Sequence, residues 1–207
     1  MNHAREVLDF WFGRLPWTPA VLKERMKFWF GGGESPHETA QRDRRIAERF
    51  GALAQRAAAG GLDAWAASPR QRLALILLLD QLPRSLHRGT GLAWAQDHRA
   101  VTLTFEGLQQ AADAALDPVQ RIFFYMPLQH SEALEAQEES LGCFRRLLAD
   151  APAELRPQFE GVLHYAQRHR DIVARFGRFP HRNAALGRAD TPEEAAWLTG
   201  GGERFGQ

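Results

Sequence analysis

The sequence contains a single cysteine, Cys143, and only two lysines, Lys23 and Lys27, although arginine is common. One cysteine excludes an internal disulfide and a zinc site built from cysteine ligands, and it favours a reducing, cytoplasmic location. No expected helix carries a His-x-x-x-His or Glu-x-x-His pair of the kind that binds a metal ion. We therefore expect no metal centre, and no feature points to a particular cofactor.

Long apolar runs are also absent. The longest, Leu73 to Leu79, is far shorter than the ~20 residues that span a bilayer. The first residues include Glu6 and Asp9 and form no continuous apolar core, so we expect no secretory signal. The formal net charge of the 207 residues is only +1, which gives no field that would draw the chain onto nucleic acid or a membrane. We expect no membrane partner, and nucleic acid is disfavoured.

No segment of useful length alternates apolar and polar residues, so β-strands are not expected. Instead, four stretches combine a capping oxygen, a proline at the first helical position and Glu or Gln at the third. They predict helices that begin near residues 36, 69, 118 and 192. The stretches are Ser35-Pro36-His37-Glu38, Ser68-Pro69-Arg70-Gln71, Asp117-Pro118-Val119-Gln120 and Thr191-Pro192-Glu193-Glu194.

The chain is thus expected to form one all-α domain, a helical array of about eight to nine helices with a frayed tail from about residue 200. The run from Leu73 to Leu79 is apolar on every side, which predicts a central helix that Pro83 ends. The remaining helices are expected at about 3–12, 20–30, 92–109, 129–149 and 154–176.

Several polar residues fall where the helical pattern calls for apolar ones. Asp80 follows the wholly apolar run, and Asp97 lies on the stripe of the helix at 92–109. His130 and Gln137 share one stripe of the helix at 129–149, and His169 lies on that of the last long helix. We predict that all five are buried and paired, because an unpaired buried polar group costs about 1–3 kcal/mol. A structural role is the simpler explanation for each residue taken alone.

The segment from Arg175 to Asn183 is strongly cationic and carries two phenylalanines. Gly177 is a plausible end for the preceding helix, and the phenylalanines would fix the exit segment to the core. The segment would then hold its polar groups in fixed places. These are Arg175, Arg178, His181, Arg182 and Asn183. Arginine suits carboxylate and phosphate geometry, so two roles stay open. The arginines either form a wall of an anion pocket or neutralise Asp80 and Asp97, with Arg84 as a further partner.

These residues also resemble a known bacterial family, the one catalogued as domain of unknown function 924. The resemblance runs nearly end to end and implies an all-helical fold of the tetratricopeptide-like superfamily, but it supplies no function. Two positions depart from the family pattern: Ser85, where Asn is common, and Gln129, where Glu is common. The resembling stretches are residues 7–13, 79–84, 88–90, 124–132, 175–183 and 186–188.

Two functions fit this pattern. The first is an enzyme or binding protein with a pocket for a small anionic ligand, in which His130 or His169 is the acid–base candidate and the arginines hold the anion. The alternative is a protein-interaction module whose arginine-lined groove binds an acidic peptide or a C-terminal carboxylate. The ligand-binding candidates are Asp80, Arg84, Asp97, His130, Gln137, His169, Arg178, His181, Arg182 and Asn183.

Overall fold

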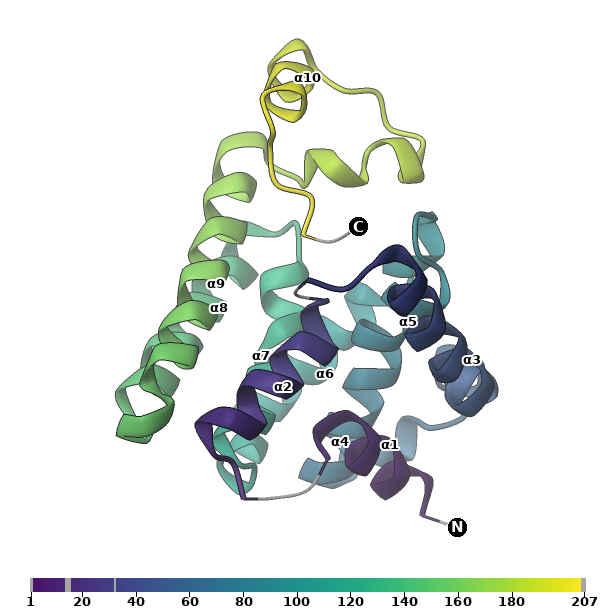
Figure 1. Ribbon diagram of the computed structural model, residues 1–207, viewed down its shortest axis with the longest axis vertical. Helices are drawn as coiled ribbons and strands as arrows, with labels where there is room; N and C mark the ends of the chain where they lie inside the picture. Colours follow the sequence, from purple (N-terminus) through teal and green to yellow (C-terminus); the bar gives the residue numbers. More distant parts are fainter. Residues whose placement is uncertain (1, 14–15, 32, 206–207) are drawn as a thin grey trace.

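The computed structural model describes residues 2–13, 16–31 and 33–205, and in this part of the chain helices are joined by turns and loops with no β-strand (Figure 1). The predicted all-α fold class is confirmed. None of the helices in these ranges combines the length and apolarity needed to cross a membrane. The α-helices are α1 (His3–Phe12), α2 (Pro19–Phe30), α3 (Pro36–Ala58), α4 (Pro69–Ile76), α5 (Leu82–Leu86), α6 (Asp97–Gln109), α7 (Pro118–His130), α8 (Leu134–Ala149), α9 (Arg156–Phe176) and α10 (Pro192–Thr199). Short 3₁₀ segments lie at Asp63–Ala67, Gly91–Trp94, Ala112–Ala115, Ala153–Leu155, Pro180–Arg182 and Ala184–Leu186.

The four proline-containing stretches all begin helices. Ser35, Asp117 and Thr191 form complete capping boxes in which the Glu or Gln at the third helical position reaches back to the cap. Ser68 differs, because its side chain makes no cap hydrogen bond. There the first turn of α4 is held by Pro69 and by the backbone N–H of Arg72, which donates to the carbonyl of Ser68 at 2.7 Å.

The helix that begins with α4 does not end at Pro83, so that prediction is wrong. It passes through one π-helical turn (Leu77–Gln81) into α5. The backbone N–H of Leu82 donates to the carbonyl of Leu77, five residues back. This wider turn lets the helix continue although Pro83 has no N–H to donate. All residues from Leu73 to Leu79 are fully buried, and Asp80 lies within the π turn rather than at a helix end.

The helix predicted at 129–149 is two helices, so that prediction is also wrong. α7 runs to His130 and α8 begins only at Leu134. The side-chain amide of Gln137 donates to the carbonyls of Gln129 at 2.7 Å and Ser131 at 2.6 Å, which satisfies the end of α7. His130 and Gln137 therefore share no helix, and Glu132 lies in the break between the two.

The helix predicted at 92–109 is shorter at its start. Residues Gly91–Trp94 form a 3₁₀ turn, and α6 begins at Asp97. The apolar spacing of the helices predicted at 129–149 and 154–176 also includes Leu134 and Tyr165, but both of these residues are exposed. Leu134 is exposed because α8 begins there, so the stripe that the sequence suggests is interrupted.

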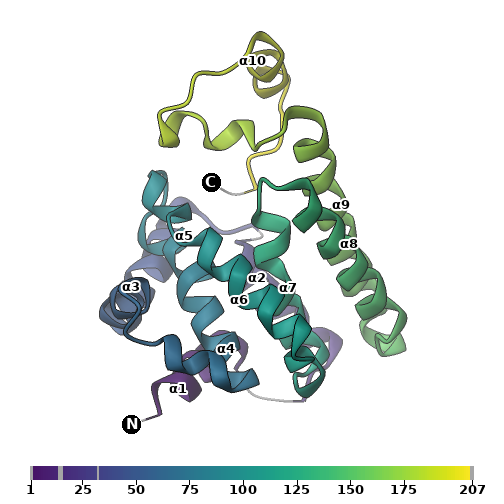
Figure 2. The same ribbon diagram turned by 180° about the vertical axis from the view of Figure 1, so that it is seen from behind.

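The helices enclose α4, which packs against α1, α6 and α7, while α8 and α9 pair along one side of the molecule (Figure 1 and Figure 2). Residues 180–199 form one end, shown in yellow-green, and the segment after α10 turns back toward the body. A small second apolar cluster, Ile172, Val173 and Phe179, lies at this end with Trp197 and Phe205 against it. This end positions the arginine-rich segment beside the π turn.

Candidate functional site

A network of buried charges surrounds the π turn. The guanidinium of Arg84 donates to both carboxylate oxygens of Asp97 at 3.0 Å, and its Nη1 lies 3.3 Å from Oδ1 of Asp80. Burial alone would raise the pKa of Asp80, but Arg84 and His130 hold it well below the usual range. The predicted burial is confirmed: Asp80, Asp97, Gln137 and His169 are buried, and the side chain of His130 is only 11% exposed.

His130, the last residue of α7, is oriented by Asp80. Its Nδ1 lies 2.8 Å from Oδ1 of Asp80. Since a carboxylate accepts, Nδ1 carries the proton and Nε2 keeps its lone pair. Burial and the neighbouring Arg84 lower the pKa of His130, and Asp80 only partly offsets them, so the ring is neutral near pH 7. A neutral imidazole held by a carboxylate is the arrangement of a general base.

The break between α7 and α8 holds the arginine-rich segment in place. The carboxylate of Glu132 accepts from the backbone N–H of Phe179 at 2.8 Å and from both Nη atoms of Arg188, at 2.6 and 2.9 Å. Glu132 thus joins the break to two points of the segment after α9. The early end of α7 is what makes this carboxylate available.

Arg182 lies beside the same network. Its Nη1 is 3.4 Å from Oδ2 of Asp97, and its guanidinium lies 4.4 Å from the ring centre of Phe179 and 5.4 Å from that of Trp94. Burial lowers the pKa of Arg182 to about 10, with Asp97 opposing, so the side chain stays charged at pH 7. The prediction that the arginine-rich segment supplies a partner to Asp80 or Asp97 is confirmed for Arg182.

Arg178 has a different partner from the predicted one. It donates to both carboxylate oxygens of Glu194, at 2.6 and 2.7 Å, and contacts neither Asp80 nor Asp97. Asn183 also turns toward this side, where its amide donates to Asp190 at 2.7 Å. Arg178 and Asn183 have these partners because α10 folds back over the arginine-rich segment and brings Glu194 close to it. Arg178 and Asn183 therefore join α10 to the segment.

We expect Arg178→Met to weaken this junction, because it leaves the buried Glu194 without its cation. Hydrogen bonds from Arg178 lower the pKa of Glu194 to about 2, so the stabilisation is present above pH 4.5 and is lost as the pH falls toward 2. Chemical denaturation should show the loss, and adding Glu194→Gln should recover part of it. Recovery by Asp97→Asn instead would contradict this pairing.

Two more histidines lie near His130. The ring centres of His130 and His169 are 6.0 Å apart, and Nδ1 of His169 donates to the carbonyl of Tyr165 at 2.8 Å. Burial and the neighbouring His130 lower the pKa of His169 well below its usual value. Burial and Arg182 lower the pKa of His181 to about 3. All three rings are therefore neutral at pH 7.

A cavity of about 760 Å³ opens beside these groups. Its charged lining is one-sided: among the described residues that line it, six are lysine or arginine and none is Asp or Glu. Five of these six cations pair with carboxylates that do not line the cavity. The pairs are Lys27 with Glu24, Arg42 with Glu34, Arg88 with Asp43, Arg84 with Asp80 and Asp97, and Arg182 with Asp97. Aromatic rings form much of the remaining wall. The cationic residues are Lys23, Lys27, Arg42, Arg84, Arg88 and Arg182, and the rings are Trp11, Trp29, Phe30, Trp94, Tyr165 and Phe205.

Buried polar atoms without a partner in the described chain gather at this lining. They are Nε of Arg182, Nδ1 of His181, Oε1 of Gln129 and Nε1 of Trp11. Unpaired buried polar atoms are rare in folded proteins, and several at one cavity indicate a place for water or a ligand. No group of three or more metal-ligating side chains gathers within residues 2–13, 16–31 and 33–205.

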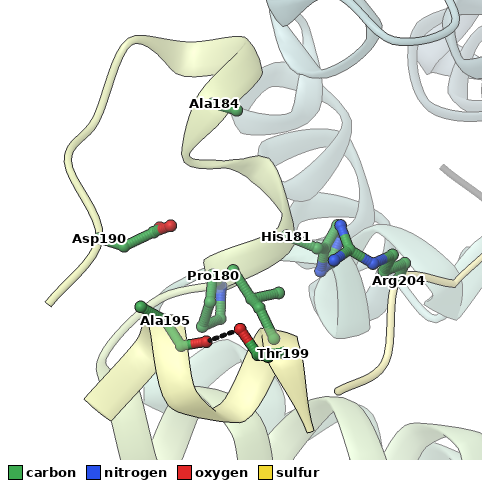
Figure 3. A pocket seen from close by; sticks show the side chains of 8 residues that line it. Pro180, His181, Ala184, Asp190, Ala195, Thr199 and Arg204 are labelled. Atoms are coloured by element: carbon green, nitrogen blue, oxygen red, sulfur yellow. Dashed lines mark hydrogen bonds between the residues drawn. The ribbon is translucent and has the colours of Figure 1, made fainter. Parts of the chain in front are cut away.

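A smaller pocket of about 310 Å³ lies between the segment after α9 and α10 (Figure 3). His181 lines both spaces, and Arg204 enters the smaller one from the C-terminal segment. The other groups drawn there contribute little charge apart from Asp190. The larger cavity therefore holds most of the polar chemistry.

The structure brings five of the ten candidate residues to the larger cavity: Arg84, His130, His169, His181 and Arg182. Asp80 and Asp97 support them from behind, whereas Gln137, Arg178 and Asn183 make structural contacts elsewhere. Sequence reasoning missed Glu132 as an anchor and the whole wall from α2. One signal was present, because the only two lysines of the chain, Lys23 and Lys27, both line the cavity.

Comparison with known proteins identifies the family of this chain. Residues 7–202 match the model of the family described as bacterial protein of unknown function, DUF924. The chain is also similar to the solved structure of a protein of unknown function from Agrobacterium tumefaciens, with 37% identity and a TM-score of 0.69. That likeness covers 86% of this chain and 97% of the other. No curated protein matches. The length of the family match and this identity show that the chain belongs to the DUF924 family.

Proposed function

We propose that this protein binds a small anionic ligand in the larger cavity. The observation that carries the proposal is the lining of six cationic side chains without a carboxylate. The volume of about 760 Å³ supports a small molecule, since ligand pockets commonly measure about 300–1,000 Å³. The unpaired atoms of Arg182, His181 and Gln129 supply polar groups that such a ligand would satisfy.

Within this site, Arg182 is the group best placed to hold the anion. Arg84 is engaged by Asp97 and Asp80, whereas Arg182 makes one long contact with Asp97 and keeps Nε unpaired within the described chain. His130 would then face the ligand with a lone pair on Nε2, oriented by Asp80. It is our candidate for a general base if the ligand is a substrate.

The test is a thermal-shift screen of small phosphates and carboxylates, followed by calorimetric titration of the best anion. A ligand that binds only the folded protein raises its melting temperature. We expect Arg182→Met to weaken binding about tenfold to a hundredfold, the range for losing a charged hydrogen bond. The stability cost should be small, because Arg84 still pairs with Asp97.

Arg178→Met is the matched control, since Arg178 lies on the same segment but pairs with Glu194 away from the cavity. It should leave the affinity unchanged. Equal affinity of wild type and Arg182→Met would overturn the role of Arg182. Binding of an acidic peptide without any small anion would favour the interaction module over the pocket.

A further inference from the structure

The segment after α10 places one of its own side chains in the larger cavity. Phe205 lines the cavity, and its ring stacks on His169 with centres 3.7 Å apart and planes 20° apart. Stacking at this distance needs a flat surface on both partners. The cavity therefore contains a place that fits a planar ring, and a residue of the same chain occupies it.

Two more rings complete this place. His181 lies 5.6 Å from the Phe205 ring at 70°, and Phe179 lies 6.4 Å away at 84°. The His169 ring covers one face of the Phe205 ring, and the rings of His181 and Phe179 stand nearly perpendicular to the Phe205 ring. The guanidinium of Arg182 lies over the ring of Phe179, 4.4 Å from the ring centre. A site for a planar ring thus lies next to Arg182, the side chain that we propose binds the anionic group of the ligand.

Apart from these ring contacts, the segment that carries Phe205 is weakly anchored. The backbone of Phe205 adopts a φ of +48°, a left-handed conformation that costs energy for a residue with a side chain. The preceding Glu203 pairs with Arg168, whose side chain is partly exposed, and such pairs add little stability. Gly201, with φ of +88°, gives the segment a flexible point. The family match ends at residue 202, before this aromatic residue.

We propose that the ligand of the cavity is an aryl anion, a planar aromatic ring bearing a phosphate or carboxylate, whose ring replaces Phe205 on His169. This proposal rests on the anion pocket proposed above. The ring of the ligand stacks on His169 between His181 and Phe179, and its anionic group reaches Arg182. Phe205 competes for the ring site and lowers the affinity of the unmodified chain.

Calorimetric titration of the full chain with phenyl phosphate and with inorganic phosphate tests this. Wild type should bind phenyl phosphate more tightly than inorganic phosphate. Phe205→Ala should strengthen phenyl phosphate binding about threefold to tenfold, the range of one aromatic stacking contact. It should leave inorganic phosphate unchanged. Phe176→Ala is the matched control, because Phe176 packs on Trp197 at the same end of the molecule and does not line the cavity.

The outcomes separate the two proposals. If neither probe binds any variant, the anion pocket is overturned and the aryl ligand with it. If both probes bind wild type equally and Phe205→Ala changes neither, only the aryl proposal fails. Weaker phenyl phosphate binding by Phe205→Ala would also overturn it, since Phe205 would then be part of the binding wall. Proton resonances of the His169 ring in wild type give a second measurement, and phenyl phosphate but not inorganic phosphate should shift them.

Discussion

Arg84→Met is expected to destabilise the protein by about 3–5 kcal/mol, because it removes the main cation from two buried carboxylates. The side chain of Arg84 is 12% exposed and pairs with both Asp97 and Asp80. Methionine keeps much of the length of arginine, so the loss comes from charge rather than from a cavity. Chemical denaturation at neutral pH measures it.

Removal of a carboxylate should reverse part of this loss. Arg84→Met combined with Asp97→Asn leaves only Asp80, which His130 still contacts, so we expect the double variant to be more stable than Arg84→Met alone. Arg175→Met serves as a control, since Arg175 and its partner Glu193 are both largely exposed. Purely additive losses in the double variant would show that Arg84 does not neutralise Asp97.

Acid is expected to destabilise the protein through its buried neutral histidines. The pKa of His169 in the folded state lies well below 6.5, chiefly because of burial. An unfolded chain therefore binds more protons than the folded one below pH 6.5. The contribution of His169 is present above pH 6.5 and is lost as the pH falls, at up to about 1.4 kcal/mol per pH unit.

Denaturation at several pH values between 7.5 and 4.5 tests this, with His169→Gln compared with wild type. The variant should lose less stability on acidification, because the titrating ring is gone. His164→Gln is the matched control, since His164 lies on the same helix and is exposed. An unchanged pH profile in His169→Gln would refute the proposed contribution.

The sequence predicted best what depends on neighbours in the chain. Helix starts at Pro36, Pro118 and Pro192 follow from capping boxes that span only four residues. The burial of His169 follows from helical periodicity, which α9 keeps up to that position, and the burial of Asp80 follows from the wholly apolar run before it.

Other features depended on contacts between distant parts of the chain. The last carbonyls of α7 accept hydrogen bonds from the side chain of Gln137 in the next helix. The apolar spacing continues past the end of α7, so the sequence pattern does not indicate that the helix ends there. The partner of Arg178 is on α10, which the pattern of local charge does not reveal. The wall from α2 is not evident from the sequence, because Lys23, Lys27 and Trp29 meet the other lining residues only in the folded chain.

The π turn has a consequence for how this helix tolerates change. Each residue of a regular α-helix advances by about 100°, and a π turn accommodates one additional residue. The side chain of Arg84, which follows the turn, meets Asp97 in this helical phase. Deleting Leu78 or Leu79 would remove this additional residue, so a regular α-helical turn could form and Arg84 would keep its phase, whereas inserting a residue would rotate Arg84 by about 100° away from its partners. An insertion here is therefore far more damaging than exchange of one leucine for another apolar residue, which leaves the phase unchanged.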